Sequence, residues 1–502
     1  MPQSWNKDLE RQCPQSEGEY DVFHTPLARN DTMLEYIKAP EWSGREGQER
    51  PGDEVSTRQH ASSHPSERIA IDVSCKLDKE GHKKKADRDS KKNNPSDQLP
   101  RSVRVVKELR RITLHFTPSW FSVNMGTGIS SILLHQLPFQ FRGLGIISNV
   151  IFGLNVLLFL FFCAISIARY TVWPTMGPTM LFHPTQSLFL GTFAMGFATI
   201  VNMCALSASP AWGPQFAIFT WVLWWIDAAF SIVICIGLPF LQFTRHEQSL
   251  DKVTGVWFLP VVSTIVAAAS GGIVAEVLPP AHARLTLVVS WILWGTGFPL
   301  AILLMALYFH RLAVFKIPPA SVIVSAFLPL GPCGQGSFGI LQISYALKGI
   351  VRKSGQALVA GESGEDAMQF ADAIYAASIP VALVIWGLGL VWLVIAISFL
   401  VDLFWVSKLT FNLGWWGFTF PLGVFCTATV QLGKELNSGA FRILGTILSL
   451  VEVALWLFIA IKTFIGALSG KLFFSPCLAE QGGEPPEFVA PARKYQYECR
   501  DD

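Results

Sequence analysis

The 502-residue chain has few charged residues, and those residues are unevenly placed. They make up 15% of the chain against 51% hydrophobic residues, and mean hydropathy is +0.39. A soluble globular protein has about 25% charged residues, so this composition excludes that class. The net charge of +2 says little, because it averages a polar N-terminal part and a long apolar remainder.

The sequence also lacks the motifs of common enzymes and metal sites. It contains no HExxH, GxSxG or P-loop pattern, and its nine cysteines form no CxxC pair or spaced cluster. The glycine-rich run at 331–339 lies in an apolar segment, which does not predict phosphate binding. We therefore expect no enzyme activity, cofactor, metal or nucleic-acid partner.

No apolar segment lies near the start, so we expect no cleavable signal peptide. Residues 1–111 are predicted to be a disordered cytoplasmic tail, because they are polar and lack apolar periodicity. Near 101–112, basic residues alternate with valines, which predicts a short amphipathic helix on the membrane surface. Residues 112–470 are the predicted transmembrane domain, and 471–502 a cytoplasmic C-terminal tail.

Ten apolar segments are long enough to cross a bilayer of about 30 Å. They are predicted at 118–136, 144–168, 186–207, 216–240, 256–276, 285–309, 319–346, 374–401, 415–433 and 441–465. An even number places both termini on one side, and the basic run before the first segment indicates the cytoplasm. Charges in the other loops do not discriminate between the two sides.

A repeat relates the odd-numbered segments. Their openings, Trp120-Phe121, Leu188-Phe189, Trp257-Phe258 and Ala326-Phe327, follow one another at intervals of 68 to 69 residues. The fifth opening, Trp415-Trp416, comes after a polar insertion. This period predicts five helical hairpins with the same orientation.

The two classes of segment also differ in composition. Odd segments contain glycine and proline, whereas several even segments are runs of bulky apolar residues. Small residues permit close helix packing, and a kinked helix is tolerated in lipid where it lines a cavity. The predicted fold is all-α, with five kinked inner helices and five straight outer helices in quasi-fivefold arrangement around a central pore.

At Trp415–Pro421 the motif WWGFTFP resembles the ninth helix of the tellurite-resistance/dicarboxylate transporter family, whose relatives include bacterial TehA proteins and plant slow-type anion channels. Within that family, Phe116–Phe141 is similar to the first helix of the fungal sulfite-efflux pumps. The resemblance covers residues 112–470 and implies ten helices in five hairpins around a pore, assembly as a homo-oligomer, often a trimer, and a pore-occluding phenylalanine. Carried over, that residue is Phe420.

Phe420 is the predicted gate, with Phe418 as the alternative and Pro421 as the kink beside both. Polar and small residues of the odd segments are the candidates for lining the pore or touching the anion, with helix–helix hydrogen bonding open as the other role. They are Asn124, Gly126, Thr127, Ser130, Thr192, Asn202, Pro260, Pro329, Gln335, Ser337 and Thr427.

Three ionisable residues are candidates for proton coupling: His135, Asp227 and Glu452. Structural pairing stays open as the alternative for the two acids. The predicted function is efflux of a small inorganic anion, sulfite or bisulfite, across the plasma membrane. The alternatives are malate or dicarboxylate transport and an anion channel of the same fold; a dicarboxylate would need a basic residue in the pore, and none is seen.

Overall fold

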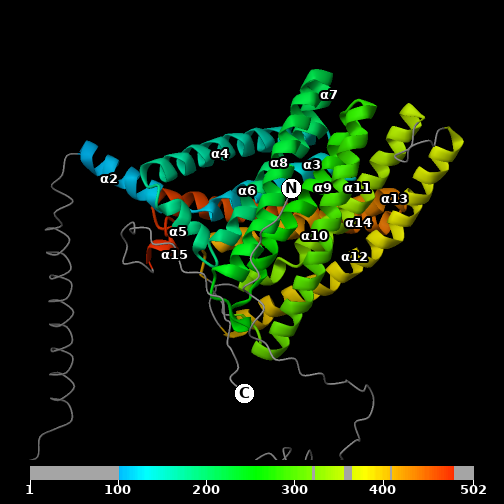
Figure 1. Ribbon diagram of the computed structural model, residues 1–502. Coiled ribbons are helices and arrows are strands. Elements are labelled where there is room, and N and C mark those ends of the chain that lie inside the picture. Colours follow the sequence, from blue (N-terminus) through cyan, green and yellow to red (C-terminus); the bar gives the residue numbers. More distant parts are fainter. Residues whose placement is uncertain (1–100, 319–322, 356–363, 407–409, 480–502) are drawn as a thin grey trace, which may run out of the picture. The chain divides into compact units, whose positions relative to one another are not determined.

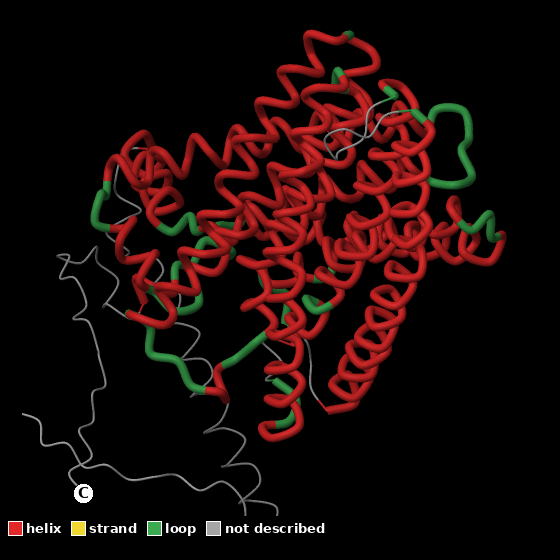
Figure 2. The backbone as a smooth tube through the Cα atoms, turned by 45° about the vertical axis from the view of Figure 1, so that its right-hand side comes forward, coloured by secondary structure: helices red, strands yellow, loops and turns green. Residues whose placement is uncertain are grey.

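The computed structural model describes residues 101–318, 323–355, 364–406 and 410–479. Within these ranges every regular element is a helix (Figure 2). The predicted disordered tail up to residue 100 and most of the predicted C-terminal tail lie outside them. Eight of the described helices are long and apolar enough to cross a membrane.

The α-helices are labelled in Figure 1. Their bounds are α2 (Arg101–Leu114), α3 (Ser122–Gln136), α4 (Leu144–Val172), α5 (Met176–Phe182), α6 (Leu190–Met203), α7 (Ser209–Trp212), α8 (Pro214–Thr244), α9 (Phe258–Val277), α10 (Pro280–Phe315), α11 (Leu330–Ser354), α12 (Glu365–Val406), α13 (Thr419–Glu435), α14 (Gly439–Leu468) and α15 (Pro476–Ala479). A π-turn, Cys204–Ala208, extends α6.

Two helices of the predicted ten, α3 and α11, are outside the set of eight candidate spans. The first is short, with 15 residues, and the second contains two glutamines and a basic end. Both are buried along most of their length, so their polar residues face other helices rather than lipid. The count of ten spans stays a prediction.

The sequence repeat coincides with a structural repeat. Each odd segment begins with a short 3₁₀ turn, and an α-helix starts one to three residues after the turn ends. These turns are η2 (Pro118–Phe121), η3 (Ser187–Phe189), η6 (Gly255–Trp257), η7 (Ile323–Phe327) and η8 (Leu413–Gly417). The repeated aromatic and apolar pairs of the sequence fall at these turns, so the period marks the start of each unit.

Burial separates the helices into two groups. We call α3, α6, α9, α11 and α13 the inner helices, and α4, α8, α10, α12 and α14 the outer helices. Between 78% and 100% of each inner candidate span is buried, against 22% to 39% of each outer one. The outer helices present bulky apolar side chains at the protein surface, such as Leu157 and Val384, as a lipid-facing helix must.

The inner helices contact one another in a closed order. Contacts join α3 to α6, α6 to α9, α9 to α11, α11 to α13, and α13 back to α3. Each inner helix also contacts the outer helix that follows it in the chain. Close approach depends on glycine at the α3–α13 seam, where a Cβ on Gly126 would lie 2.4 Å from the Thr419 hydroxyl.

The expectation that prolines interrupt the inner helices and are absent from the outer ones is wrong. Pro421 is the third residue of α13 and Pro260 the third residue of α9, while Pro329 is the N-cap of α11. A proline in the first turn removes an N–H that has no helical partner, so it does not break the helix. Prolines inside helices occur instead in the outer helices α8, α10 and α12.

Candidate functional site

A cavity of about 110 Å³ lies where the 3₁₀ turns of the inner helices converge. All five repeat units contribute to its lining, which is mostly apolar. Representative residues, one from each unit, are Met125, Thr192, Leu259, Leu328 and Pro421. Two predicted site residues, Thr192 and Pro421, therefore line this cavity.

Phe420 directly precedes Pro421 in α13 and is only 2% exposed. The outer side of α13 is fixed by α12: Phe425 stacks on Trp386 at 5.4 Å, and the Trp386 indole donates to Thr429 at 2.9 Å. Helical spacing puts Phe420 and Thr427, two turns apart, on another face, away from that contact.

Phe418 lies in a different environment. Its ring packs edge-on against Phe327 at 4.9 Å and against Trp415 at 5.8 Å. Phe420 takes part in none of the aromatic contacts among the described residues. The structure thus places Phe418 in the packing between two 3₁₀ turns, and Phe420 apart from it.

The polar residues of α3 are turned toward outer helices. Asn124 donates to the Asn155 side chain of α4 at 3.0 Å, and Thr127 accepts from the Trp456 indole of α14 at 3.1 Å. Ser130 lies 3.1 and 3.2 Å from the carboxylate oxygens of Glu452. These hydrogen bonds connect α3 to α4 and α14.

Two side-chain amides of the inner helices make no hydrogen bonds with other described residues. The side chains of Asn202 and Gln335, 6% and 4% exposed, make none of the hydrogen bonds of the described residues, so the N–H groups of both amides are available to donate. In contrast, Ser337 donates to the Ala382 carbonyl of α12 at 2.9 Å. Asn202 and Gln335 are therefore the predicted polar residues most available to an anion.

The three candidates for proton coupling lie in different places. Asp227 on α8 is fully buried, and neither carboxylate oxygen has a hydrogen-bond partner among the described residues. Glu452 is equally buried but contacts Ser130. His135 is in the last turn of α3. The structure does not bring the three together.

A polar cluster that the sequence did not predict lies near the C-terminal ends of α9 and α13 and beside the middle of α11. Gln342 of α11 donates to Glu276 of α9, and Gln431 donates to Glu435 within α13 at 2.6 Å. Tyr375 of α12 also donates to Glu435. A signal was present: Gln342 and Gln431 are separated by the same 89 residues that separate Phe327 and Trp416.

Comparison with known proteins identifies the group to which this arrangement belongs. Residues 115–464 match the SLAC1 family, described as voltage-dependent anion channel. The sulfite efflux pump SSU1 of Arthroderma otae is 46% identical over 361 residues, which cover 72% of this chain and 92% of that protein. The malic acid transport protein of Schizosaccharomyces pombe is 26% identical over 356 residues, covering 70% of this chain and 79% of that protein. These matches confirm the resemblance drawn from the sequence, and the chain belongs to the SLAC1 family of membrane anion transporters.

Proposed function

We propose that this protein exports sulfite or bisulfite across the plasma membrane through the centre of the inner-helix ring. Support comes from the family and from the relative at 46% identity, whose name is sulfite efflux pump. The malic acid transport protein is a more distant relative, at 26% identity. The smaller anion is therefore the proposed substrate.

The closed order of contacts among the five inner helices is the observation on which the proposal rests. Five helices that each contact the next, and the last the first, enclose an axis. The cavity at the 3₁₀ turns lies at one end of this axis, and Phe420, the second residue of α13, precedes the lining residue Pro421. We infer that the Phe420 ring closes the passage and that its rotation opens the passage.

The lining favours a weakly held anion over a tightly bound one. The cavity is lined by apolar side chains with hydroxyls such as Thr192 and Ser325, and by no lysine or arginine. The Ser325 hydroxyl and the unused amides of Asn202 and Gln335 can donate to a monoanion and replace part of its hydration shell. The Thr192 hydroxyl, in contrast, already donates to the Phe189 carbonyl at 2.7 Å. A dicarboxylate has two separated charges to compensate and would be served poorly by such a lining.

Topology and assembly are part of the same proposal. The basic residues of α2 precede the first span, which favours cytoplasmic termini. The outer helices expose large apolar surfaces, and these can contact lipid or further copies of the chain. We propose a homo-oligomer, by family resemblance a trimer, in which each subunit contains its own passage.

Flux measurements on the full chain in proteoliposomes test the substrate. Radiolabelled sulfite and malate are loaded at equal concentration, and efflux of each is followed with and without a pH gradient. We expect sulfite efflux well above protein-free vesicles and little malate efflux. Faster malate than sulfite efflux would favour the dicarboxylate alternative, and no flux of either would contradict the proposal.

A further inference from the structure

Arg169, in the last turn of α4, is a buried cation that has no counter-ion among the described residues. The residue is 0% exposed, and its Nε and Nη1 atoms have no hydrogen-bond partner in the part of the chain that the structure describes. The remaining contact is weak, from Nη2 to the Ser475 hydroxyl at 3.5 Å. A guanidinium has five N–H donors, and removing it from water is costly unless an anion or acceptors compensate.

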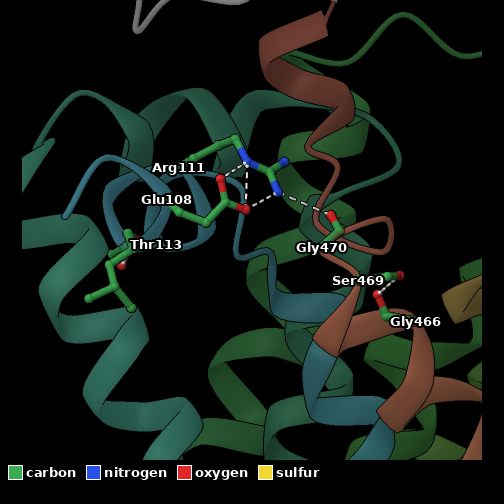
Figure 3. Close-up of polar contacts among 7 residues, drawn as sticks. Glu108, Arg111, Thr113, Gly466, Ser469 and Gly470 are labelled. Atoms are coloured by element: carbon green, nitrogen blue, oxygen red, sulfur yellow. Dashed lines mark hydrogen bonds and ion pairs between the residues drawn. The ribbon is translucent and has the colours of Figure 1, made fainter. Parts of the chain in front are cut away.

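The one carboxylate of α2, Glu108, is not available to Arg169. Arg111 forms an ion pair with Glu108 at 2.5 Å and donates to the Gly470 carbonyl at 3.2 Å, as Figure 3 shows. This pair uses the acid of α2, and no described carboxylate forms an ion pair with Arg169. The Tyr170 ring, 5.4 Å away, supplies a cation–π contact, which does not neutralise the charge.

A second unpartnered polar atom lies in the same region. The Nδ1 atom of His115 is buried and makes no hydrogen bond among the described residues. Burial, and then the nearby charges of Arg111 and Arg169, lower the pKa of His115. The imidazole is thus close to Arg169 and neutral at pH 7, where Nδ1 can donate in the tautomer that has its proton there.

The surroundings indicate which anion is at hand. Helix α2 contacts α4 and exposes an apolar face with Val103, Val106 and Leu109 beside its basic residues. Arg110 of α2 also lies over the Trp173 ring at 5.6 Å, just beyond the end of α4. An amphipathic basic helix of this kind lies at the level of phospholipid headgroups.

We propose that Arg169 binds a phosphate-type oxyanion, with His115 Nδ1 as a second donor, in a site enclosed by α2, the end of α4 and the segment around Ser475. The phosphate of a phospholipid headgroup or free phosphate has this chemistry. Its charge offsets the buried guanidinium, so it holds the C-terminal segment and α2 against α4. Because Arg169 is fully covered, the anion enters only when the segment around Ser475 moves. The proposal does not depend on the transported substrate.

Thermal unfolding of the full chain in detergent tests the site, with inorganic phosphate compared with chloride at equal ionic strength. The test variant is Arg169→Gln, and the matched control is Arg142→Gln, an exposed arginine in the turn before α4. We expect phosphate to raise the midpoint of the wild type and of Arg142→Gln by several degrees, and to leave Arg169→Gln unmoved. An equal shift in Arg169→Gln would overturn the proposal.

A second set of measurements, made in lipid, distinguishes the two sources of the anion. The same proteins are placed in nanodiscs of phosphatidylcholine with or without 20% phosphatidic acid. A shift of the unfolding midpoint with free phosphate in detergent indicates that the bound anion comes from solution. A shift seen only with phosphatidic acid indicates that the bound anion is a lipid headgroup. If Arg169→Gln does not fold, native mass spectrometry of the wild type decides: a retained phosphate or phospholipid supports the site, and its absence after both treatments contradicts it.

Discussion

Alanine at Gly334 and alanine at Gly349, both in α11, should change stability in opposite directions. A Cβ on Gly334 would lie 2.5 Å from the Phe425 backbone nitrogen and 2.6 Å from the Val424 carbonyl carbon of α13. These are backbone atoms, which cannot rotate away as a side chain can. Gly349 has nothing within 4 Å of such a Cβ.

The expected magnitudes follow from these distances. Overpacking a rigid seam costs about 1–3 kcal/mol, so Gly334→Ala should lower the free energy of unfolding by at least that much. Gly349→Ala adds only helix propensity, worth about 0.5–1 kcal/mol in favour of alanine. The two variants should therefore differ by about 2 kcal/mol or more, although the substitution and the helix are the same.

Unfolding of the purified protein in detergent, by heat and by denaturant, measures the difference. A lower midpoint for Gly334→Ala and an equal or higher one for Gly349→Ala would support close contact of α11 with α13. If Gly334→Ala were as stable as Gly349→Ala, the two helices could not be in backbone contact, and the closed order of the ring would be wrong at this seam.

Two further predictions concern hydrogen bonds and pH. Trp386→Phe keeps an aromatic ring against Phe425 but removes the 2.9 Å bond from the indole to Thr429, together with part of the packed indole surface. Because the bond is worth about 1 kcal/mol, Thr429→Val should cost about 1 kcal/mol less in the Trp386→Phe background than in the wild type. Additive losses in this double-mutant cycle would contradict the bond. The pKa of His115 is lowered from its ordinary value of 6.5, mainly by burial. The fold favours the neutral form, so His115 contributes stability above pH 6.5 that is lost as pH falls through the lowered pKa. Between pH 7 and pH 5 the unfolding midpoint of His115→Gln should fall less than that of the wild type. An equal fall in both proteins would show that His115 does not cause the pH dependence. The pKa of His246 is lowered as well, mainly by burial, so some acid sensitivity should remain in the variant.

Much of the architecture could be predicted because the spacing of repeated residues and the composition of the apolar segments depend on it directly. The intervals between Phe121, Phe189, Phe258 and Phe327 repeat with the structural unit, since each marks the same 3₁₀ turn or the residue after it. Small residues indicated which segments pack most closely, and the burial of the inner helices agrees with that reasoning.

The prolines show where such reasoning fails. A proline in an apolar segment suggests a kink only if the helix begins well before it. The 3₁₀ turn at Leu413–Gly417 delays the start of α13 to Thr419, so Pro421 is in the first turn. The length of an apolar run does not reveal such a delay.

The roles of polar residues were the least predictable. Which way Asn124 or Thr127 faces depends on the rotation of α3 against α4 and α14, and that rotation is set by packing across the whole bundle. Both side chains bond to outer helices in the structure. Local sequence beside a glycine contains no information about that rotation.

The central claim is that the inner helices enclose a passage closed by Phe420, and flux through Phe420→Ala tests it most directly. Moving a buried phenyl ring costs about 1.5–3 kcal/mol, so its removal should raise sulfite flux in proteoliposomes by about tenfold or more. Phe418→Ala, which alters the packing against Phe327, should leave the flux near that of the wild type. Unchanged flux in a folded Phe420→Ala, or an equal rise in Phe418→Ala, would contradict the claim.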